Sequence, residues 1–274
     1  MPVIKETSPK EFRKILPLLE EFQNQSISEE DWRKIFHCNW WKDQSITGFH
    51  LEDRGNVEGF LGGVFSTRQI NGKLEHLCNL TSWIVREGFR QHSLALLLEI
   101  LKIKDHTFTN FTATSETSEI SQHLGFSVLD RRFRVILPAF GMLNPFPSSN
   151  RGVWVTGNLA FIKSQLDGEL LRILNDHVDT KLHPLLIKNR DEKCLAFYKI
   201  VVRRKKIRAS YFLSVSNIPL FAAQINKIMR WIFFRHFALF SIIDERFVAE
   251  VDIRSSKSRE MPSPMLFKSD NLQP

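Results

Sequence analysis

The chain has 274 residues, enough for two ordinary domains that each bury a core of their own. Its content of 43% hydrophobic and 25% charged residues is typical of a folded globular protein and excludes a disordered or fibrous one. The formal net charge of +8 favours an anionic partner: a phosphate-rich cofactor, a nucleic acid or a membrane surface.

Three cysteines, Cys38, Cys78 and Cys194, lie far apart in the sequence and form no CxxC pair. An odd number of separated cysteines argues for a reducing compartment and against structural zinc. The N-terminal segment lacks the apolar core of a signal peptide, and no uncharged run approaches the ~18 residues of a membrane span. We therefore expect a cytoplasmic protein without a membrane span or a metal site.

In the first half, helix starts are predicted at two serines. Ser8 is followed by Pro9 and Glu11, and Ser28 has Asp31 three residues later, both patterns typical of capped helices. Strand-like runs follow at residues 46–53, 57–70 and 73–85, and then a helix, a strand, a second helix and a last strand up to residue 137. This order predicts an α/β fold built on a sheet of mixed direction.

The residues from 138 to 152 concentrate proline, glycine, serine and asparagine, which predicts a linker between two domains. The second half then repeats the order helix, three strands, helix, strand. We therefore predict an N-terminal domain at 1–137 and a second domain at 153–254. The tail at 255–274 has no sustained period, and we expect it to be mobile or laid over the surface.

The stretch "WIVREGFRQHSLALLLEIL", residues 83–101, predicts a strand, a short basic turn and a helix. A helix N-terminus leaves amide groups unpaired and carries partial positive charge, so it suits a phosphate. Arg86 and Arg90 add full charges to this turn. Ser93 and Ala95 are small enough to let a pyrophosphate approach the backbone closely.

These residues resemble the acyl-CoA motif of the Gcn5-related N-acetyltransferase (GNAT) superfamily, a strand followed by Arg/Gln-x-x-Gly-x-Gly/Ala and a helix. Arg90, Ser93 and Ala95 fall on the motif positions, and the later Leu124-Gly125-Phe126 is similar to the second signature of the family. The resemblance implies a mostly antiparallel sheet flanked by helices, and acetyl-CoA or another acyl-CoA as the cofactor. It assigns cofactor binding to Val85, Arg90, Gln91, His92, Ser93, Leu94 and Ala95.

The resemblance also suggests catalytic positions, each with a departure from the family pattern. Ser121 stands where many members carry a tyrosine that protonates the leaving thiolate, and serine is shorter and less acidic. Asn79 stands where some members carry a glutamate base, and asparagine cannot take a proton. Glu75 and His76, earlier on the same strand, are substitute bases acting through water. The working hypothesis is acyl transfer to an amine; the alternative is a non-catalytic acyl-CoA-binding module or scaffold.

The second half resembles a degraded copy of the same fold. Its junction has Ser216 and Asn217 before Pro219 but lacks the phosphate motif, so we do not expect it to bind coenzyme A in the same manner. The two-domain pattern is similar to tandem acetyltransferase-like proteins of bacterial cell-surface polysaccharide loci. That resemblance suggests a small-molecule or sugar amine as the acceptor, and it leaves the oligomeric state open.

Three further features have a structural explanation that we favour over a functional one, and a fourth has a structural explanation that fits equally well. The basic run at 201–210 predicts a hairpin turn rather than a nucleic-acid or anionic-surface patch. The aromatic run at 228–243 predicts a core helix and strand rather than a membrane contact. His76 and Cys78 share a strand face without a visible third metal ligand. Four phenylalanines are candidates for lining a long acyl pocket, but core packing explains them equally well; they are Phe60, Phe65, Phe108 and Phe111.

Overall fold

The structure is a computed structural model that describes the whole chain except residues 23–26, 38–45, 71, 138–151, 204–205, 254 and 274. The predicted linker, apart from Gly152, and Cys38 lie outside the described residues. The chain divides into two compact units, one formed by Met1–Leu129 with Ser263–Pro274 and the other by Asp130–Pro262. The chain therefore passes from one unit to the other twice, after Leu129 and after Pro262.

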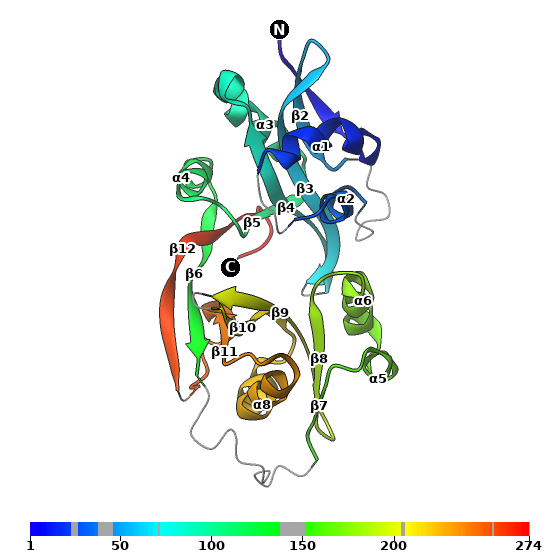
Figure 1. Cartoon of the computed structure of the whole chain (residues 1–274), viewed down its shortest axis with the longest axis vertical. Helices are drawn as coiled ribbons and strands as arrows, with labels where there is room; N and C mark the ends of the chain where they lie inside the picture. Colours follow the sequence, from blue (N-terminus) through cyan, green and yellow to red (C-terminus); the bar gives the residue numbers. More distant parts are fainter. Residues whose placement is uncertain are drawn as a thin grey trace. The chain divides into compact units, whose positions relative to one another are not determined.

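The first unit is built on a mixed sheet in which β1 to β4 are antiparallel neighbours, β4 and β5 are parallel, and the end of β12 (Ser256–Lys268) is antiparallel to β5 (Figure 1). Its elements are β1 (Val3–Thr7), α1 (Phe12–Glu20), α2 (Glu29–Phe36), β2 (Gly48–Asp53), β3 (Asn56–Ile70), β4 (Lys73–Val85), α3 (Ser93–Leu101), β5 (His106–Asn110) and α4 (Ser115–His123). The predicted mixed, mostly antiparallel α/β fold is confirmed.

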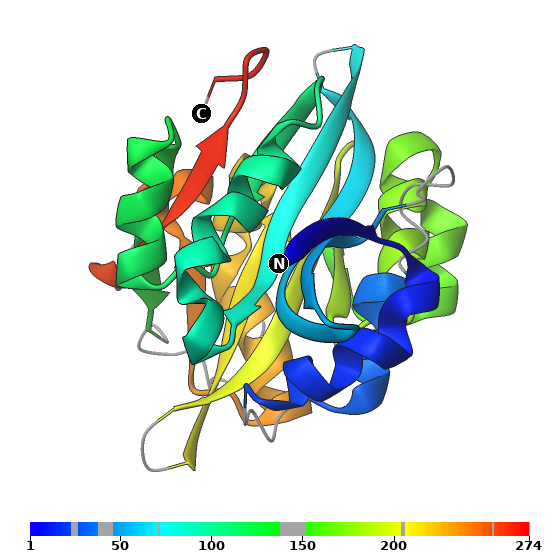
Figure 2. The ribbon, with the colours of Figure 1, turned by 90° about the horizontal axis from the view of Figure 1, so that it is seen from above.

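Two apolar clusters cover the two faces of this sheet. Phe60 of β3 packs with the buried residues of α1 and α2, whereas its neighbour Leu61 packs with those of α3. Successive side chains of a strand point to opposite faces, so α1 and α2 lie on one side of β3 and β4 and α3 lies on the other. Figure 2 shows these strands between α1 and α3.

The helix starts predicted from serine caps are confirmed. The Ser8 side chain accepts from a backbone amide of the short 3-10 turn at Pro9–Glu11, and Glu11 bonds back to the Ser8 amide. Ser28 and Asp31 make the same reciprocal pair at the start of α2. Each box satisfies amide groups that the first helical turn leaves unpaired.

The second unit has a similar order of elements, and its parallel pair of strands is β10 and β11. Its strands lie in the order β6-β11-β10-β9-β8-β7. The elements are β6 (Ser127–Ile136), β7 (Trp154–Thr156), α5 (Leu159–Gln165), α6 (Gly168–His177), β8 (His183–Lys188), β9 (Lys193–Arg203), β10 (Ile207–Val215), α7 (Ile218–Ala223), α8 (Ile225–His236), β11 (Phe240–Asp244) and β12 (Ser256–Lys268).

The C-terminal residues form a strand, so the expectation of a mobile or surface-laid tail is wrong for 256–268. Residues Leu266–Lys268 at the end of β12 pair with β5, and Leu266 is fully buried in the apolar cluster under α3. The Lys268 ammonium donates to the Leu124 carbonyl at 2.6 Å. The last strand of the chain therefore completes the sheet of the first unit.

Candidate functional site

The first unit contains a gap between two neighbouring parallel strands. Strands β4 and β5 pair from His76 opposite His106 to Asn79 opposite Thr109, and β5 ends at the next residue while β4 continues to Val85. Beyond Asn79, therefore, no described strand pairs with the β5-facing edge of β4.

A β-bulge in β4 lies directly beside this gap. Gly62 of β3 is opposite Thr81, but Phe60 is opposite Ile84, so Ser82 and Trp83 together face the single residue Leu61. Ser82 has a φ of 54°, in the left-handed region that non-glycine residues seldom adopt. Such a bulge bends its strand and redirects side chains, here at the point where the two strands part.

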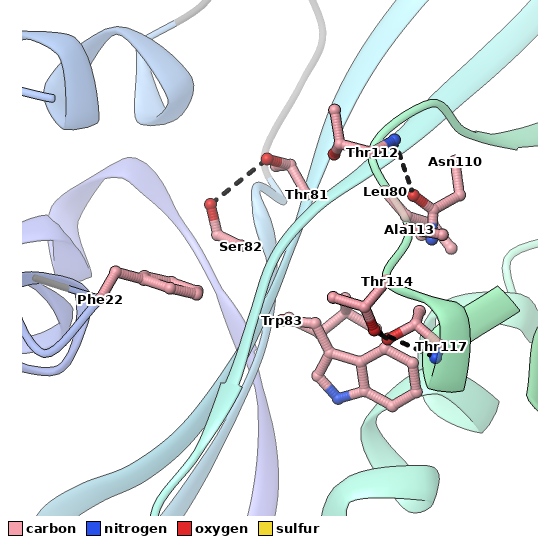
Figure 3. Close-up of a pocket in the computed structure, with 11 residues that line it drawn as sticks. Phe22, Leu80, Thr81, Ser82, Trp83, Asn110, Thr112, Ala113, Thr114 and Thr117 are labelled. Atoms are coloured by element: carbon pink, nitrogen blue, oxygen red, sulfur yellow. Dashed lines mark hydrogen bonds between the residues drawn. The ribbon is translucent and has the colours of Figure 1, made fainter. Parts of the chain in front are cut away.

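A cavity of about 180 Å³ occupies the gap (Figure 3). Its walls come from one side chain of β3, the bulged part of β4, the end of β5 with the segment after it, and the first turn of α4, with Phe22 from the turn that follows α1. The lining residues are Phe22, Leu61, Leu80, Thr81, Ser82, Trp83, Asn110, Thr112, Ala113, Thr114 and Thr117. The polar part of this described lining consists of hydroxyl groups, one amide and one indole, without a carboxylate, imidazole, thiol or amine.

Some of these polar groups are hydrogen-bonded to one another, whereas one buried donor has no partner among the described residues. The Asn110 side-chain oxygen accepts from the Thr112 amide at 3.3 Å, and the Thr114 hydroxyl accepts from the Thr117 amide at 3.2 Å as the cap of α4 (Figure 3). The indole Nε1 of Trp83 is buried and has no hydrogen-bond partner among the described residues. Because an unpaired buried donor is costly, this N–H favours an acceptor from a ligand or water in the cavity.

The predicted strand–turn–helix junction follows directly after the bulge, and its geometry is confirmed. Val85 ends β4 opposite Gly59, residues Glu87–His92 form a 3-10 helix, and α3 starts at Ser93. Arg90, Gln91 and Leu94 are exposed, whereas His92, Ser93 and Ala95 are half-buried. The Ser93 amide donates to the Arg90 carbonyl, so the helical turns begin well before α3.

Arg86 does not supply the free charge expected at this turn. Its guanidinium donates to Glu21 at 2.7 Å and to Glu58 at 3.0 Å, and these hydrogen bonds, the one to Glu21 first, raise the pKa of Arg86. Its positive charge is thus neutralised by two carboxylates, and Arg86 connects the end of β4 to the end of α1. Arg90 takes part in no such ion pair among the described residues.

The four catalytic candidates do not line the cavity. Glu75 and His76 lie near the start of β4, at least about 13 Å along the strand from Leu80 at a rise of ~3.3 Å per residue. The His76 ring contacts that of His106 instead, with 5.4 Å between centroids.

The other two candidates are held by neighbouring groups. The Asn79 side-chain oxygen accepts from the Thr109 hydroxyl at 3.1 Å, which ties β4 to β5 at the last residue pair before the gap. Ser121 is fully buried, and its hydroxyl donates to the Thr117 carbonyl one turn earlier in α4, at 2.8 Å. Asn79 is thus the direct neighbour of the lining residue Leu80, and Ser121 bonds to the lining residue Thr117, but neither is part of the lining itself.

Sequence reasoning missed the hydroxyl groups that line the cavity. Their signal in the sequence was the run "NFTATSET" after β5, which supplies Thr112, Thr114 and Thr117. The four phenylalanine candidates are absent from the lining; Phe60, Phe65 and Phe108 are buried in the core. Burial also raises the pKa of the Cys78 thiol, which disfavours the nucleophilic thiolate.

The corresponding junction of the second unit is capped by its own side chains. The Asn217 side-chain oxygen accepts from the Leu220 amide at 3.0 Å, and the Ser216 hydroxyl accepts from the Leu195 amide at 2.8 Å. These two hydrogen bonds satisfy amide groups beside the junction, and the expectation about coenzyme A at this junction stays a prediction.

No protein-family model matches the chain, and no curated protein sequence matches it either. Several solved structures do match the chain. A GCN5-related N-acetyltransferase from Anabaena variabilis matches with a TM-score of 0.61 at 12% identity, over 97% of this chain and 72% of that one. A probable N-acyltransferase from Enterococcus faecalis matches with a TM-score of 0.64 at 8% identity, over 97% and 72%.

Saccharomyces cerevisiae N-myristoyltransferase, solved with bound myristoyl-CoA, matches with a TM-score of 0.51 at 8% identity, over 97% of this chain and 78% of that one. The chain has the GNAT fold. This GNAT-fold similarity extends over both compact units and is not confined to the first, which carries the sequence motif. Among the described residues, no helix of the structure is both long and apolar enough to cross a membrane, and no group of side chains is arranged to hold a metal ion.

Proposed function

We propose that the chain is an acyl-CoA-dependent N-acyltransferase that binds the thioester end of its cofactor in the gap between β4 and β5. The observation that carries the proposal is the hydroxyl-lined cavity beside the bulged part of β4, whose edge toward β5 pairs with no described strand. The pantetheine arm of coenzyme A is an extended chain with two amide groups. It can hydrogen-bond to an open strand edge as an added strand does.

The phosphate end of the cofactor would lie at the junction after Val85. The helical turns from Glu87 onward present amide groups and partial positive charge, and the exposed Arg90 adds a full charge. The site residues of this proposal are those predicted from the motif, Val85 and Arg90 to Ala95. The structure adds Trp83, whose unpaired indole N–H is available to an acceptor on the arm.

The reaction would join the acceptor nitrogen to the acyl carbon and break the carbon–sulfur bond. The nitrogen loses a proton and the departing thiolate takes one up. Because the described lining offers no carboxylate or imidazole, the protein's contribution is to position the two reactants and to stabilise the oxyanion with N–H or O–H donors. The acceptor must then arrive as a neutral amine, and its proton leaves to water.

The size of the cavity favours a short acyl group. A cavity of about 180 Å³ has room for an acetyl or similarly short acyl group beside the end of the pantetheine arm. We keep a small-molecule or sugar amine as the proposed acceptor, and a cytoplasmic site of action, which the two buried free thiols of Cys78 and Cys194 support.

The competing function is a non-catalytic acyl-CoA-binding scaffold. The observation in its favour is that Ser121, at the position of the usual proton donor, is buried and bonded to the Thr117 carbonyl. The two functions share the cofactor site and differ in turnover. Release of free thiol from acetyl-CoA in the presence of an amine panel separates them.

The first test is a calorimetric titration of the full chain with acetyl-CoA and with a long-chain acyl-CoA. We expect binding of acetyl-CoA, and a loss of most of that affinity in Arg90→Glu and in Ala113→Trp, which fills the cavity. The matched control is Lys104→Glu, the same charge change on an exposed residue at the other end of α3. No binding of either ligand, or equal effects of Arg90→Glu and Lys104→Glu, would reject the proposed site.

A further inference from the structure

The second unit contains an extended tract without negative charge. The 51 residues from Lys193 to Ile243 include ten Lys and Arg residues and no Asp or Glu, whereas the whole chain has a net charge of only +8. The tract covers β9, β10, α7, α8 and most of β11. The basic run at 201–210 spans the β9–β10 hairpin turn, which confirms the predicted hairpin. This hairpin extends past the neighbouring strands of its unit (Figure 2).

Large apolar side chains are exposed at the same end of this unit. The exposed fractions are 65% for Phe234, 67% for Phe237, 48% for Leu239, 64% for Val202 and 37% for Ile207. The predicted core role of this segment is confirmed for the other side of α8, where Ile225, Ile228, Met229 and Ile232 are buried, and for the strand β11, where Ile242 and Ile243 are buried. The exposed aromatic side chains need another explanation, because a surface helix usually presents polar residues to water.

The exposed basic side chains and the exposed apolar side chains adjoin one another. The Arg208 guanidinium of β10 donates to the His236 carbonyl at the end of α8, and the Leu239 amide donates to the Arg208 carbonyl at 2.9 Å. Val202 lies opposite Arg208 in the β9–β10 ladder. We call these residues the basic-aromatic patch: Val202, Arg203, Lys206, Ile207, Arg208, Phe234, Arg235, Phe237 and Leu239.

Phe237 is also held in an unfavourable backbone conformation. It ends α8 with a φ of 54°, the left-handed cap position that glycine normally occupies. A phenylalanine there is strained, and with two-thirds of its surface exposed it gains little from burial. Its ring contacts that of Phe233 at 6.2 Å between centroids, so the exposed aromatic group is supported from the helix behind it.

The charge of the patch decides among possible occupants. Among the described residues, no ion pair involves Arg203, Lys206, Arg208 or Arg235, so a second copy of the chain would bring like charges together. Nucleic acid would pair with the arginines but would leave the aliphatic and phenylalanine side chains in water. A bilayer with anionic headgroups matches both kinds of side chain, since phosphates face the basic groups while apolar tips enter the acyl boundary.

We propose that the basic-aromatic patch docks the second unit onto a membrane surface rich in anionic phospholipid. Phe234, Phe237 and Leu239 enter the boundary between headgroups and acyl chains, and Arg203, Arg208 and Arg235 contact phosphates. This docking is peripheral and independent of the acyl-CoA site in the first unit, so either proposal stands if the other fails.

The test is co-sedimentation of the full chain with phosphatidylcholine vesicles made with and without phosphatidylglycerol. We expect binding only to the anionic vesicles. Arg203→Gln and Arg235→Gln should each weaken it about fivefold, the effect of one basic side chain near an anionic surface. Lys104→Gln and Leu74→Ser, which change an exposed basic and an exposed apolar residue of the first unit, are the matched controls and should leave binding unchanged.

Phe237→Gly separates a docking role from a structural one. Glycine suits the left-handed cap, so the variant should be as stable as the wild type or more so. Its membrane affinity should fall about tenfold through the lost apolar burial. Equal binding to neutral vesicles, unchanged affinity in Phe237→Gly, a change from dimer to monomer in that variant, or binding to a DNA duplex in place of vesicles would each overturn the proposal.

Discussion

Substitution of Leu266 by alanine tests whether the C-terminal strand belongs to the core of the first unit. Leu266 is fully buried among residues that include Phe65 and Phe108. Replacing a buried leucine by alanine typically lowers the free energy of unfolding by 2–5 kcal/mol, and we take about 3 kcal/mol. For a unit of about 140 residues the unfolding entropy is ~0.3 kcal/mol/K, so the expected decrease in Tm is about 10 °C.

Differential scanning calorimetry of the full chain measures this shift, with Leu74→Ala as the matched control. Leu74 lies on β4 of the same unit and is 64% exposed, so its replacement should change the free energy of unfolding by no more than about 0.5 kcal/mol. If Leu266→Ala shifted the transition as little as Leu74→Ala, β12 would not contribute to the core. The sequence-based expectation of a tail would then be right.

Three further substitutions test other parts of the structure. In Gly48→Ala the new Cβ would lie 2.2 Å from the Leu61 carbonyl oxygen, so urea unfolding should show a loss of more than about 2 kcal/mol; wild-type stability would refute this packing. Hydrogen bonds from lysines, that from Lys14 first, lower the pKa of Glu52 from 4.5 to about 2. The stability from this carboxylate is therefore present above pH ~4.5 and lost as the pH falls toward 2, and Glu52→Gln should flatten that part of an acid titration. Burial lowers the pKa of His236, so the folded state favours its neutral form and stability should fall as the pH drops below ~6.5; a Tm profile that His236→Gln leaves unchanged would contradict this.

Local patterns in the sequence predicted much of the fold. The serine caps at Ser8 and Ser28 located two helix starts, because a cap depends only on residues three positions apart. The strand ending at Val85 and the following helical turns were also predictable from apolar spacing. The candidate cavity was harder to predict from the sequence, since its walls come from four separated segments that sequence spacing does not bring together.

The amino-acid sequence by itself therefore determined most elements of the first unit, their order and the motif that resembles an acyl-CoA site, all of which depend on short-range periodicity and capping. Only the tertiary structure decided three features. The C-terminal residues become a strand because β5 offers an edge on which Leu266 can be buried. Glu75 and His76 are excluded from the cavity because they lie too far along β4. The bulge at Ser82 exists because β3 supplies one residue against two, a register that only the pairing of distant strands can set.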